Sequence, residues 1–360
     1  MKSIYKLVLL IFLIPSIAFA NNEHDEKKHE KSKSVNKSFN VNGNATLEIY
    51  NKYGDINVTS WDQNRVEIDV KITVKGNDLD DVEDRLKQIQ IEFEASSSLV
   101  IAKTTIANSN NWTFWKKSKN ISYEINYTVK MPVTNNAKLN NDYGSIRLDE
   151  LEGNADIHCD YGKVTLGNLK GNDTNISLDY CASSSIDSMK DGNIRIDYSK
   201  LTVENASDID LSTDYSTVKF KKVNHLEFSA DYGSIDVEEV NSAHGSGDYT
   251  GFKFGTITNK LKLNSDYGSI YIKNLAEGFE SVDINSEYAG IKIGTSPNNH
   301  FSFTIDLQYA GFKRNDQYVE LFKSIEKNTK KHYEGVYGKG KSNSKVTIKS
   351  EYGSVTFYEN

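Results

Sequence analysis

The chain has 360 residues, a formal net charge of −7, 37% hydrophobic residues, three prolines and two cysteines. This length allows one large domain or two ordinary ones. A chain with this net negative charge lacks the basic surface that nucleic-acid-binding proteins use, so we expect no nucleic-acid partner. Because proline is nearly absent, the turns must be formed by Gly, Asn, Asp and Ser.

The first twenty residues have the pattern of a secretory signal peptide. In MKSIYKLVLLIFLIPSIAFA, two lysines flank the start of an apolar run, and Ala18-Phe19-Ala20 forms a small-x-small cleavage site. The alternative is an N-terminal membrane anchor, but the run is short for a bilayer and no later stretch reaches transmembrane length. We therefore expect a signal peptide at 1–20, export to the periplasm or the outer cell surface, and no integral membrane segment after cleavage. The charged residues 21–38 predict a disordered spacer.

Residues 39–135 predict a β-rich cap that carries one short helix. The stretch NVNGNATLEIYNKYGDINVTSWDQNRVEIDVKITVKG has the character of strands. In NDLDDVEDRLKQIQI, Leu79, Val82 and Leu86 share a face, so we expect a helix at about 78–90 with Asn77 or Asp78 as its cap. A stack of repeats needs such a cap to cover its open end.

Residues 136–312 repeat a unit centred on tyrosine, as in NNDYGSIRLDEL and SADYGSIDVEEV. Successive tyrosines from Tyr143 to Tyr309 are 17–21 residues apart, a period typical of stacked repeats. With Tyr as position zero, apolar residues fall at −6, −4, +3, +5 and +8, which predicts two short strands separated by a turn. Coils stacked at about 4.8 Å would bury these residues in one column. We therefore predict an all-β fold, a single-chain parallel β-solenoid with coils of 17–21 residues.

The repeated tyrosines have two interpretations. Each shares the inward phase of the strand before it, which favours a ring packed at the corner with its hydroxyl reaching water. The alternative is an outward aromatic ladder for sugars or a partner surface. The candidate ladder residues are Tyr143, Tyr161, Tyr198, Tyr215, Tyr232, Tyr249 and Tyr267. The position after each tyrosine holds Gly in some units and Cys, Ser, Thr or Ala in others, so it does not require a positive φ. We therefore expect the glycines at this position to allow close approach between coils.

An aspartate precedes most of these tyrosines. The residues are Asp142, Asp160, Asp179, Asp197, Asp214, Asp231, Asp248 and Asp266. Stacked about 4.8 Å apart, neighbouring carboxylates repel by roughly 0.9 kcal/mol in bulk water. Asx-turn hydrogen bonds to the backbone two residues on would offset this repulsion. Bound calcium, which prefers carboxylate oxygens, is the alternative.

Residues 313–344 interrupt the repeat before a terminal coil at 345–360. The stretch DQYVELFKSIEKNTKKHYEGVYGKGKSNS predicts a partly helical excursion. It also holds the one basic patch on an acidic chain, formed by Lys323, Lys327, Lys330, Lys331, Lys339 and Lys341. The patch predicts either an anionic-glycan site or a solvated lid over the last coils.

The two cysteines, Cys159 and Cys181, lie in consecutive units and would meet an oxidising compartment after export. Their offset of three positions along a strand is about 10 Å, beyond the reach of a disulfide. The corner between strands could shorten this separation, so a disulfide between them stays open.

No catalytic motif stands out. The seven histidines are scattered, and HExxH, GxSxG and phosphate-loop patterns are absent from the sequence. The enzymatic alternative is a β-helical polysaccharide-degrading enzyme with paired carboxylates. Because nearly every unit carries an Asp, a pair of carboxylates does not indicate a catalytic site in this chain. We therefore expect a protein that is not an enzyme. We expect no cofactor, with bound calcium as the alternative.

The order of YNKYGDINVTSWDQNRVEIDV, a helix, YTVKMPV and units like DYGSIRLDELEG resembles the bacterial putative-adhesin domain family, which includes the head GIN domains. The closing VYGKGKSNSKVTIKSEYGSVTFYEN is similar to the terminal coil of that family. The chain departs from it by placing Tyr where relatives often have small polar residues. The resemblance implies a right-handed β-helix-like fold at the cell envelope.

Two functions follow from these expectations. The first is an adhesin or ligand-binding surface protein, whose partner would be a glycan or an envelope or host-surface protein. The second is a periplasmic structural or sensory protein linked to envelope signalling. Exposed terminal coils could also mediate self-association.

Overall fold

The structure is a computed structural model that describes residues 27–107 and 120–360. The signal-peptide prediction for 1–20 lies outside the described residues. Within them, the chain forms twenty-four strands and one helix, and the strands join in one large hydrogen-bonded sheet. The protein is therefore all-β, as the sequence predicts.

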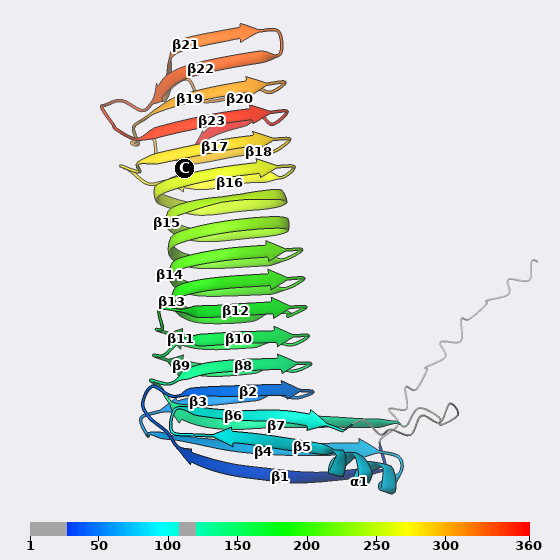
Figure 1. Ribbon diagram of the computed structural model, residues 1–360. Helices are drawn as coiled ribbons and strands as arrows, with labels where there is room; N and C mark the ends of the chain where they lie inside the picture. Colours follow the sequence, from blue (N-terminus) through cyan, green and yellow to red (C-terminus); the bar gives the residue numbers. More distant parts are fainter. Residues whose placement is uncertain (1–26, 108–119) are drawn as a thin grey trace, which may run out of the picture.

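The N-terminal region is a cap of antiparallel and parallel strands with one helix packed at its side (Figure 1). Its elements are β1 (His29–Asn40), β2 (Thr46–Lys52), β3 (Ile56–Trp61), β4 (Arg65–Gly76), α1 (Leu79–Gln88), β5 (Ile89–Ala95), β6 (Leu99–Ile106) and β7 (Ile121–Pro132). Asp78 is the N-cap of α1 and accepts a hydrogen bond from the backbone N–H of Asp81. The buried Val82 fixes the helix to the cap.

The predicted disordered spacer is wrong where the structure describes it, because residues 29–38 belong to β1. This strand pairs antiparallel with β4 along its whole length. Val35 and Phe39 pack against the core, and the Lys33 ammonium group donates to the carbonyl of Ile89, just after α1. Backbone pairing does not depend on side-chain hydrophobicity, and a charged sequence suits an edge strand.

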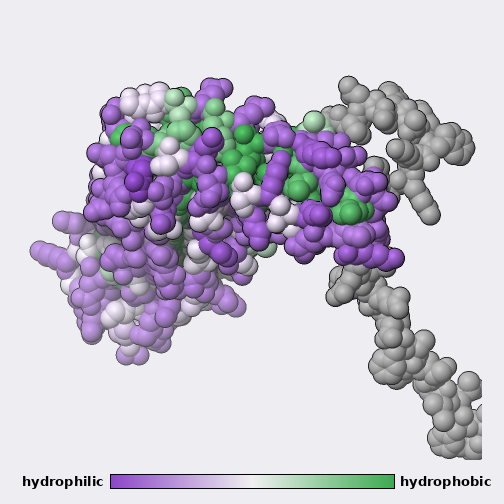
Figure 2. Space-filling view, turned by 90° about the horizontal axis from the view of Figure 1, so that it is seen from below, coloured by the Kyte–Doolittle hydropathy of each residue, from purple (hydrophilic) through white to green (hydrophobic). Residues whose placement is uncertain are grey.

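Figure 2 views the molecule from the cap end, where hydrophobic residues reach the surface between hydrophilic ones. Partly buried apolar side chains of the cap strands, among them Phe39, Ile91 and Phe93, pack against the core.

Above the cap, the strands of each repeat lie on the equivalent strands of the next (Figure 1). These elements are β8 (Asn136–Asp142), β9 (Ile146–Leu151), β10 (Ala155–Asp160), β11 (Val164–Leu169), β12 (Thr174–Asp179), β13 (Ser184–Asp197), β14 (Lys200–Asp214), β15 (Thr217–Asp266), β16 (Ser269–Leu275), β17 (Ser281–Glu287), β18 (Gly290–Thr295) and β19 (Phe301–Gln308). All pairings from β8 to β18 are parallel, and they match residues at the same position of the repeat.

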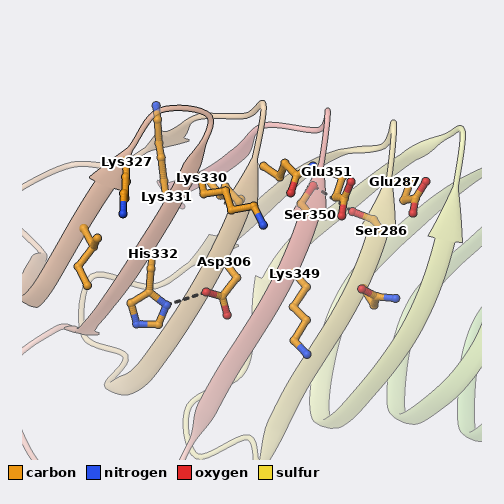
Figure 3. A pocket seen from close by; sticks show the side chains of 14 residues that line it. Ser286, Glu287, Asp306, Lys327, Lys330, Lys331, His332, Lys349, Ser350 and Glu351 are labelled. Atoms are coloured by element: carbon orange, nitrogen blue, oxygen red, sulfur yellow. Dashed lines mark hydrogen bonds and ion pairs between the residues drawn. The ribbon is translucent and has the colours of Figure 1, made fainter.

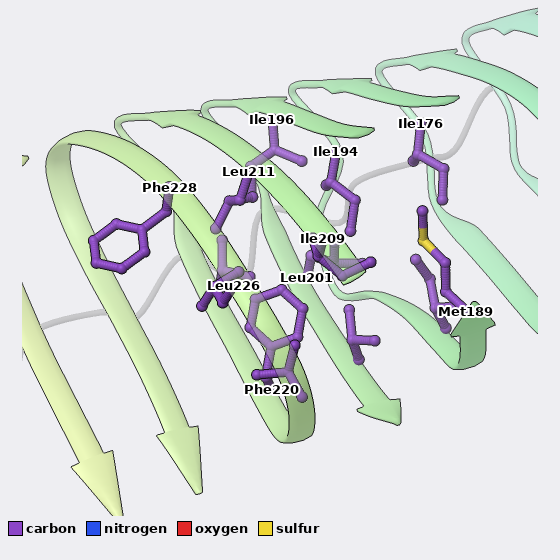
Figure 4. Packing of buried hydrophobic residues seen from close by; sticks show 14 of the residues in the cluster. Ile176, Met189, Ile194, Ile196, Leu201, Ile209, Leu211, Phe220, Leu226 and Phe228 are labelled. Atoms are coloured by element: carbon purple, nitrogen blue, oxygen red, sulfur yellow. The ribbon is translucent and has the colours of Figure 1, made fainter. Parts of the chain in front are cut away.

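The core is a column of equivalent apolar side chains. Ile157 pairs in register with Ile176, Ile176 with Ile194, and Ile194 with Leu211. Each of these side chains is at most 2% exposed, and Figure 4 shows Ile176, Ile194 and Leu211 directed to the interior. Burying each contributes roughly 1.5–3 kcal/mol, so the −6, −4, +3, +5 and +8 pattern of the sequence specifies the stack.

The glycines after the tyrosines allow the close approach that the sequence predicts. A Cβ atom on Gly233 would lie 2.0 Å from the carbonyl oxygen of Ser216 in the preceding coil. At the same position of other coils, Ser199 and Ser216 instead donate their hydroxyls to backbone carbonyls of Asp197 and Asp214.

The C-terminal elements are β20 (Phe312–Lys313), β21 (Val319–Lys327), β22 (Lys330–Tyr337), β23 (Lys345–Glu351) and β24 (Val355–Glu359). The terminal coil is not the last of the stack. Instead, β23 pairs in parallel with both β17 and β19, so residues 345–359 lie between the two preceding coils (Figure 1). The outermost elements at this end are the antiparallel strands β22 and β21.

The predicted helical excursion in 313–344 is wrong, because this segment contains the β21–β22 hairpin. Its two-residue turn contains Asn328, whose φ of 55° is left-handed. Tyr333 and Tyr337 are buried, alternate with partly exposed residues and cover the end of the core, whereas Phe322 and Ile325 remain exposed. Burial of this alternating face outweighs the helical spacing of the apolar residues on β21.

Candidate ligand-binding face

Every repeat tyrosine adopts the left-handed backbone conformation, with φ between 46° and 63°. The twelve residues are Tyr53, Tyr143, Tyr161, Tyr180, Tyr198, Tyr215, Tyr232, Tyr249, Tyr267, Tyr288, Tyr309 and Tyr352. This conformation costs about 1–2 kcal/mol for a residue with a Cβ atom. Positive φ is thus required at the tyrosine itself and not at the residue that follows it.

The left-handed residue also reverses the direction of the side chain, so the predicted inward packing of the rings is wrong. The tyrosines are 38–54% exposed and form the outward ladder that was the alternative expectation. Their backbones remain part of the stack, because the N–H of Tyr143 donates to the carbonyl of Asp160 in the next coil.

Neighbouring rings of the tyrosine ladder are parallel. Ring centroids are 4.6–5.2 Å apart and planes differ by at most 8° from Tyr53 to Tyr309. Eleven steps of about 4.8 Å make the ladder roughly 50 Å long. Because each interior ring covers the faces of its neighbours, the ladder offers ring edges and hydroxyls to a ligand.

Four phenol groups of the ladder have a raised pKa. Desolvation, then the neighbouring Tyr215 and Tyr249, raise the pKa of Tyr232 above its usual value. The same causes raise the pKa of Tyr161, Tyr198 and Tyr288. A protonated phenol both donates and accepts hydrogen bonds, so the ladder is a strip of donors and acceptors.

An acidic column runs beside the ladder at the position before each tyrosine. Asp142 pairs with Asp160, Asp214 with Asp231, and Asp266 with Glu287. The carboxylates of Asp231 and Asp266 accept bonds from the backbone of the following coil, which differs from the predicted Asx-turn. At the cap end, the Lys52 ammonium lies 2.7 Å from the Asp142 carboxylate.

One group in this column could hold a cation. Donor atoms of His158, Asp160 and Asp179 lie within 4.8 Å of one another. A set with an imidazole suits a transition metal better than calcium, which takes oxygen ligands. These side chains are partly exposed, and stacked carboxylates occur here along the whole column, so calcium stays a prediction.

The structure divides the predicted basic patch into separate groups. Lys323 on β21 pairs with Glu334 at 2.9 Å. Lys327, Lys330 and Lys331 gather around the tip of the hairpin, beside the last ring of the ladder. Lys339 and Lys341 follow β22 at the opposite end of that strand.

The three lysines at the hairpin tip line a groove of about 530 Å³ (Figure 3). Its other lining residues come from β17, β19, β21, β22 and β23, and they include Lys349 on one side and Glu287 and Glu351 on the other. Lys349 and His332 also line the groove, and the sequence pattern does not predict this, because their proximity depends on the insertion of β23 between coils.

Cys159 and Cys181 are buried free thiols in the structure. The corner brings them together despite their offset in sequence, and the Cys181 thiol donates to the carbonyl of Cys159 at 3.1 Å. The side-chain hydrogen bond with Cys181, followed by burial, raises the pKa of Cys159. A disulfide after export stays a prediction.

No protein-family model and no curated protein matches the chain. Several solved structures are similar to it, among them the following three. A putative adhesin from Parabacteroides distasonis has 13% identity and a TM-score of 0.38, with 91% of this chain and 97% of that chain covered. A putative adhesin from Parabacteroides merdae has 14% identity and a TM-score of 0.31, with 91% and 96% covered. A putative lipid binding protein from Parabacteroides distasonis has 9% identity and a TM-score of 0.33, with 92% and 98% covered.

Within the described residues, no helix has the length and apolar character needed to span a membrane.

Proposed function

We propose that this chain is an exported, non-enzymatic parallel β-solenoid that binds an extended glycan along the tyrosine ladder, as an adhesin or ligand-binding protein of the bacterial cell envelope. The parallel register of successive coils supports the solenoid. The signal-peptide pattern supports export. The kinship with head GIN-type domains and a right-handed winding are part of this proposal.

The observation that carries the proposal is the left-handed conformation of twelve exposed tyrosines. Glycine would adopt this conformation without strain. One stacking contact per residue contributes about 0.5–1.5 kcal/mol, which is close to the backbone cost of about 1–2 kcal/mol. Stacking therefore gives little net stability over glycine, and strain of this kind is typical of functional surfaces.

The geometry of the ladder suits a hydroxyl-rich chain. Its hydroxyls repeat with the coil spacing of about 4.8 Å. An extended pyranose residue is also about 5 Å long, given single bonds near 1.5 Å. The acidic column beside the ladder disfavours a polyanion over most of its length and favours neutral or amine-bearing glycans.

The test is binding of neutral and amine-bearing β-linked oligosaccharides to the mature chain. The triple variant Tyr198→Asn, Tyr215→Asn, Tyr232→Asn removes three central rings with a residue that tolerates a left-handed backbone. Tyr271→Asn is the control, because Tyr271 lies outside the ladder and contacts Tyr358. We expect binding to weaken at least tenfold in the triple variant only. Equal binding by all three proteins would contradict the proposal.

The second candidate is a periplasmic structural or sensory protein. It is favoured by the continuity of the ring stack, which would then serve only to stiffen the coils. Protease shaving of intact cells separates the two candidates. Digestion at exposed loops supports a surface protein, whereas protection that is lost only on lysis supports the periplasmic alternative.

A further inference from the structure

We propose that the groove at the C-terminal end of the ladder binds the acidic group, carboxylate or phosphate, of a glycan that lies along the tyrosines. This inference rests on the proposed function for the orientation of the glycan. The anion site itself stands on the charges and contacts of the groove.

The acidic column changes the sign of its charge near the groove. Parallel and antiparallel pairing places Glu287 beside Glu351, Glu351 beside Gln308, and Gln308 beside Lys330. Lys330 in turn pairs with Lys327 across the hairpin. The position that carries a carboxylate in the preceding coils thus becomes neutral and then cationic within two steps.

The lysines of the groove form no ion pair with a carboxylate among the described residues. Elsewhere on the stack, several lysines lie against acids of neighbouring coils, as in Lys219 with Glu238 at 2.6 Å and Lys260 with Glu280 at 2.7 Å. In the part of the chain that the structure describes, no ion pair includes the four groove lysines. They are Lys327, Lys330, Lys331 and Lys349. Four unpaired ammonium groups around one groove favour an anionic ligand.

The acids nearest to the hairpin do not neutralise these lysines. The Asp306 carboxylate accepts a hydrogen bond from Nδ1 of His332 at 2.6 Å (Figure 3). Glu334 lies 2.7 Å from Nε2 of the same ring and 2.9 Å from the Lys323 ammonium. Glu326, opposite Lys331 in the hairpin, accepts a hydrogen bond from the Tyr333 hydroxyl. Of the carboxylates that line the groove, Glu287 and Glu351 remain, on the side toward the acidic column. The hairpin side therefore keeps a positive charge.

The groove is continuous with the tyrosine ladder. The N–H of Tyr309 donates to the carbonyl of Thr329 in the turn of the hairpin, at 2.8 Å. Among the described residues, Tyr309 has one stacked ladder neighbour, Tyr352, so one of its faces has no aromatic partner. That face can stack on a sugar ring whose acidic substituent reaches Lys330. An ammonium group suits both carboxylate and phosphate as a point charge.

The site is tested on the mature chain by titration with inorganic phosphate and, separately, with oligogalacturonate, using amide chemical shifts. We expect shifts at 306–309, 327–332 and 349–351, and tenfold or more weaker binding in the variant Lys327→Met, Lys330→Met. The control is Lys292→Met, Lys313→Met, which removes two lysines of β18 and β20 that do not line the groove. Binding of oligogalacturonate but not phosphate identifies a carboxylate-specific site, and binding of both supports a general anion site.

Equal weakening in the lysine variant and its control would overturn the site, as would shifts spread along the whole stack. The outcomes also separate this inference from the proposed function. Loss of neutral-glycan binding in the tyrosine triple variant tests the ladder and leaves the anion site unaffected. Phosphate binding by the same variant tests the groove and does not depend on the ladder.

Discussion

The ring of Tyr352 lies 4.6 Å from that of Tyr288, and the two are parallel, although Tyr309 stands between them in sequence. Tyr309 stacks on the other face of Tyr352 at 4.9 Å. The last coil of the chain is therefore held on both faces, and it joins β19 and the hairpin to the rest of the stack.

The first prediction concerns this inserted coil. Deletion of 345–360 would leave β17 and β19 without the strand that pairs with both. We expect the segment 301–337 to lose protection in amide hydrogen exchange while 136–275 keeps it, because a stacked repeat contacts only its neighbours. Deletion of Asn360 alone is the control. Retained protection of 301–337 after the long deletion would mean that β19 pairs directly with β17.

The second prediction separates backbone strain from ring stacking at Tyr215, whose φ is 46°. Tyr215→Ala keeps a Cβ atom in the left-handed conformation, whereas Tyr215→Gly removes it. We expect the glycine variant to be more stable than the alanine variant by about 1 kcal/mol, measured by urea unfolding. The same pair of variants at Thr217, which has no positive φ, should show the reverse order.

The third prediction concerns repulsion in the acidic column. Desolvation, then the neighbours Asp266 and Asp231, raise the pKa of Asp248 above its usual value. A carboxyl group whose folded pKa is raised opposes folding at neutral pH, and this cost disappears as the pH falls through the folded pKa. We expect Asp248→Asn to stabilise the protein at pH 7 by about 0.5–1 kcal/mol at low salt, and by less at pH 4.

Added calcium tests the same column. If calcium neutralises the carboxylates, chelation lowers the Tm of the wild-type protein, and the shift is smaller in Asp248→Asn. An unchanged Tm on chelation would leave the backbone hydrogen bonds of the column, such as that from Asp248 to Asp231, as the compensation for repulsion.

Several features of the fold follow directly from the sequence. The period and the five apolar positions specify the coils, because every unit repeats the same buried positions. The helix of the cap is specified by its own apolar face and its N-cap residue, which are local in sequence. The direction of the tyrosines does not follow from strand alternation, because one left-handed residue reverses the phase. Asn would have signalled such a residue, but Tyr at φ near 50° is rare.

The order of the last coils is also beyond the sequence pattern. The unit around Tyr352 has the same strands and the same tyrosine as its neighbours, so it fits any slot in the stack. Its place is set by the hairpin, whose Tyr333 and Tyr337 cover the end of the core. For the same reason, the groove combines residues far apart in sequence, and only the three lysines at the hairpin tip could be anticipated.

The fourth prediction is a pH dependence of the hairpin. Hydrogen bonds to the carboxylates of Asp306, then Glu334, raise the pKa of His332 above its usual value, while desolvation and then Lys323 oppose them. A histidine with a raised folded pKa contributes stability that is fully present below its unfolded pKa of about 6.5 and is lost as the pH rises through the folded value. We expect faster amide exchange in 319–337 at pH 8 than at pH 6, after correction for intrinsic rates.

The matched variant for this prediction is His332→Gln, which keeps a side chain of similar size but cannot be protonated. In this variant, the ratio of the corrected amide exchange rates of 319–337 at pH 8 and pH 6 should fall to the ratio measured for the neighbouring coils. If the variant keeps the pH dependence of the wild type, the source is another group of the hairpin and not the contacts of His332.

The fifth prediction concerns the exposed edge of β21, the outermost strand at this end. A bulge between Leu321 and Lys323 disrupts its register, and Glu326 accepts a hydrogen bond from the mostly buried Tyr333 at 2.7 Å. Bulges, lysines and inward-directed charges protect edge strands from pairing with another copy. We expect Lys323→Val, Glu326→Val to form end-to-end oligomers in sedimentation velocity, since the apolar Phe322 and Ile325 already lie exposed there. The control Lys292→Val, Lys313→Val should sediment as the wild type does. If the wild type forms the same oligomers, the bulge and the charges of β21 do not protect this edge from self-association.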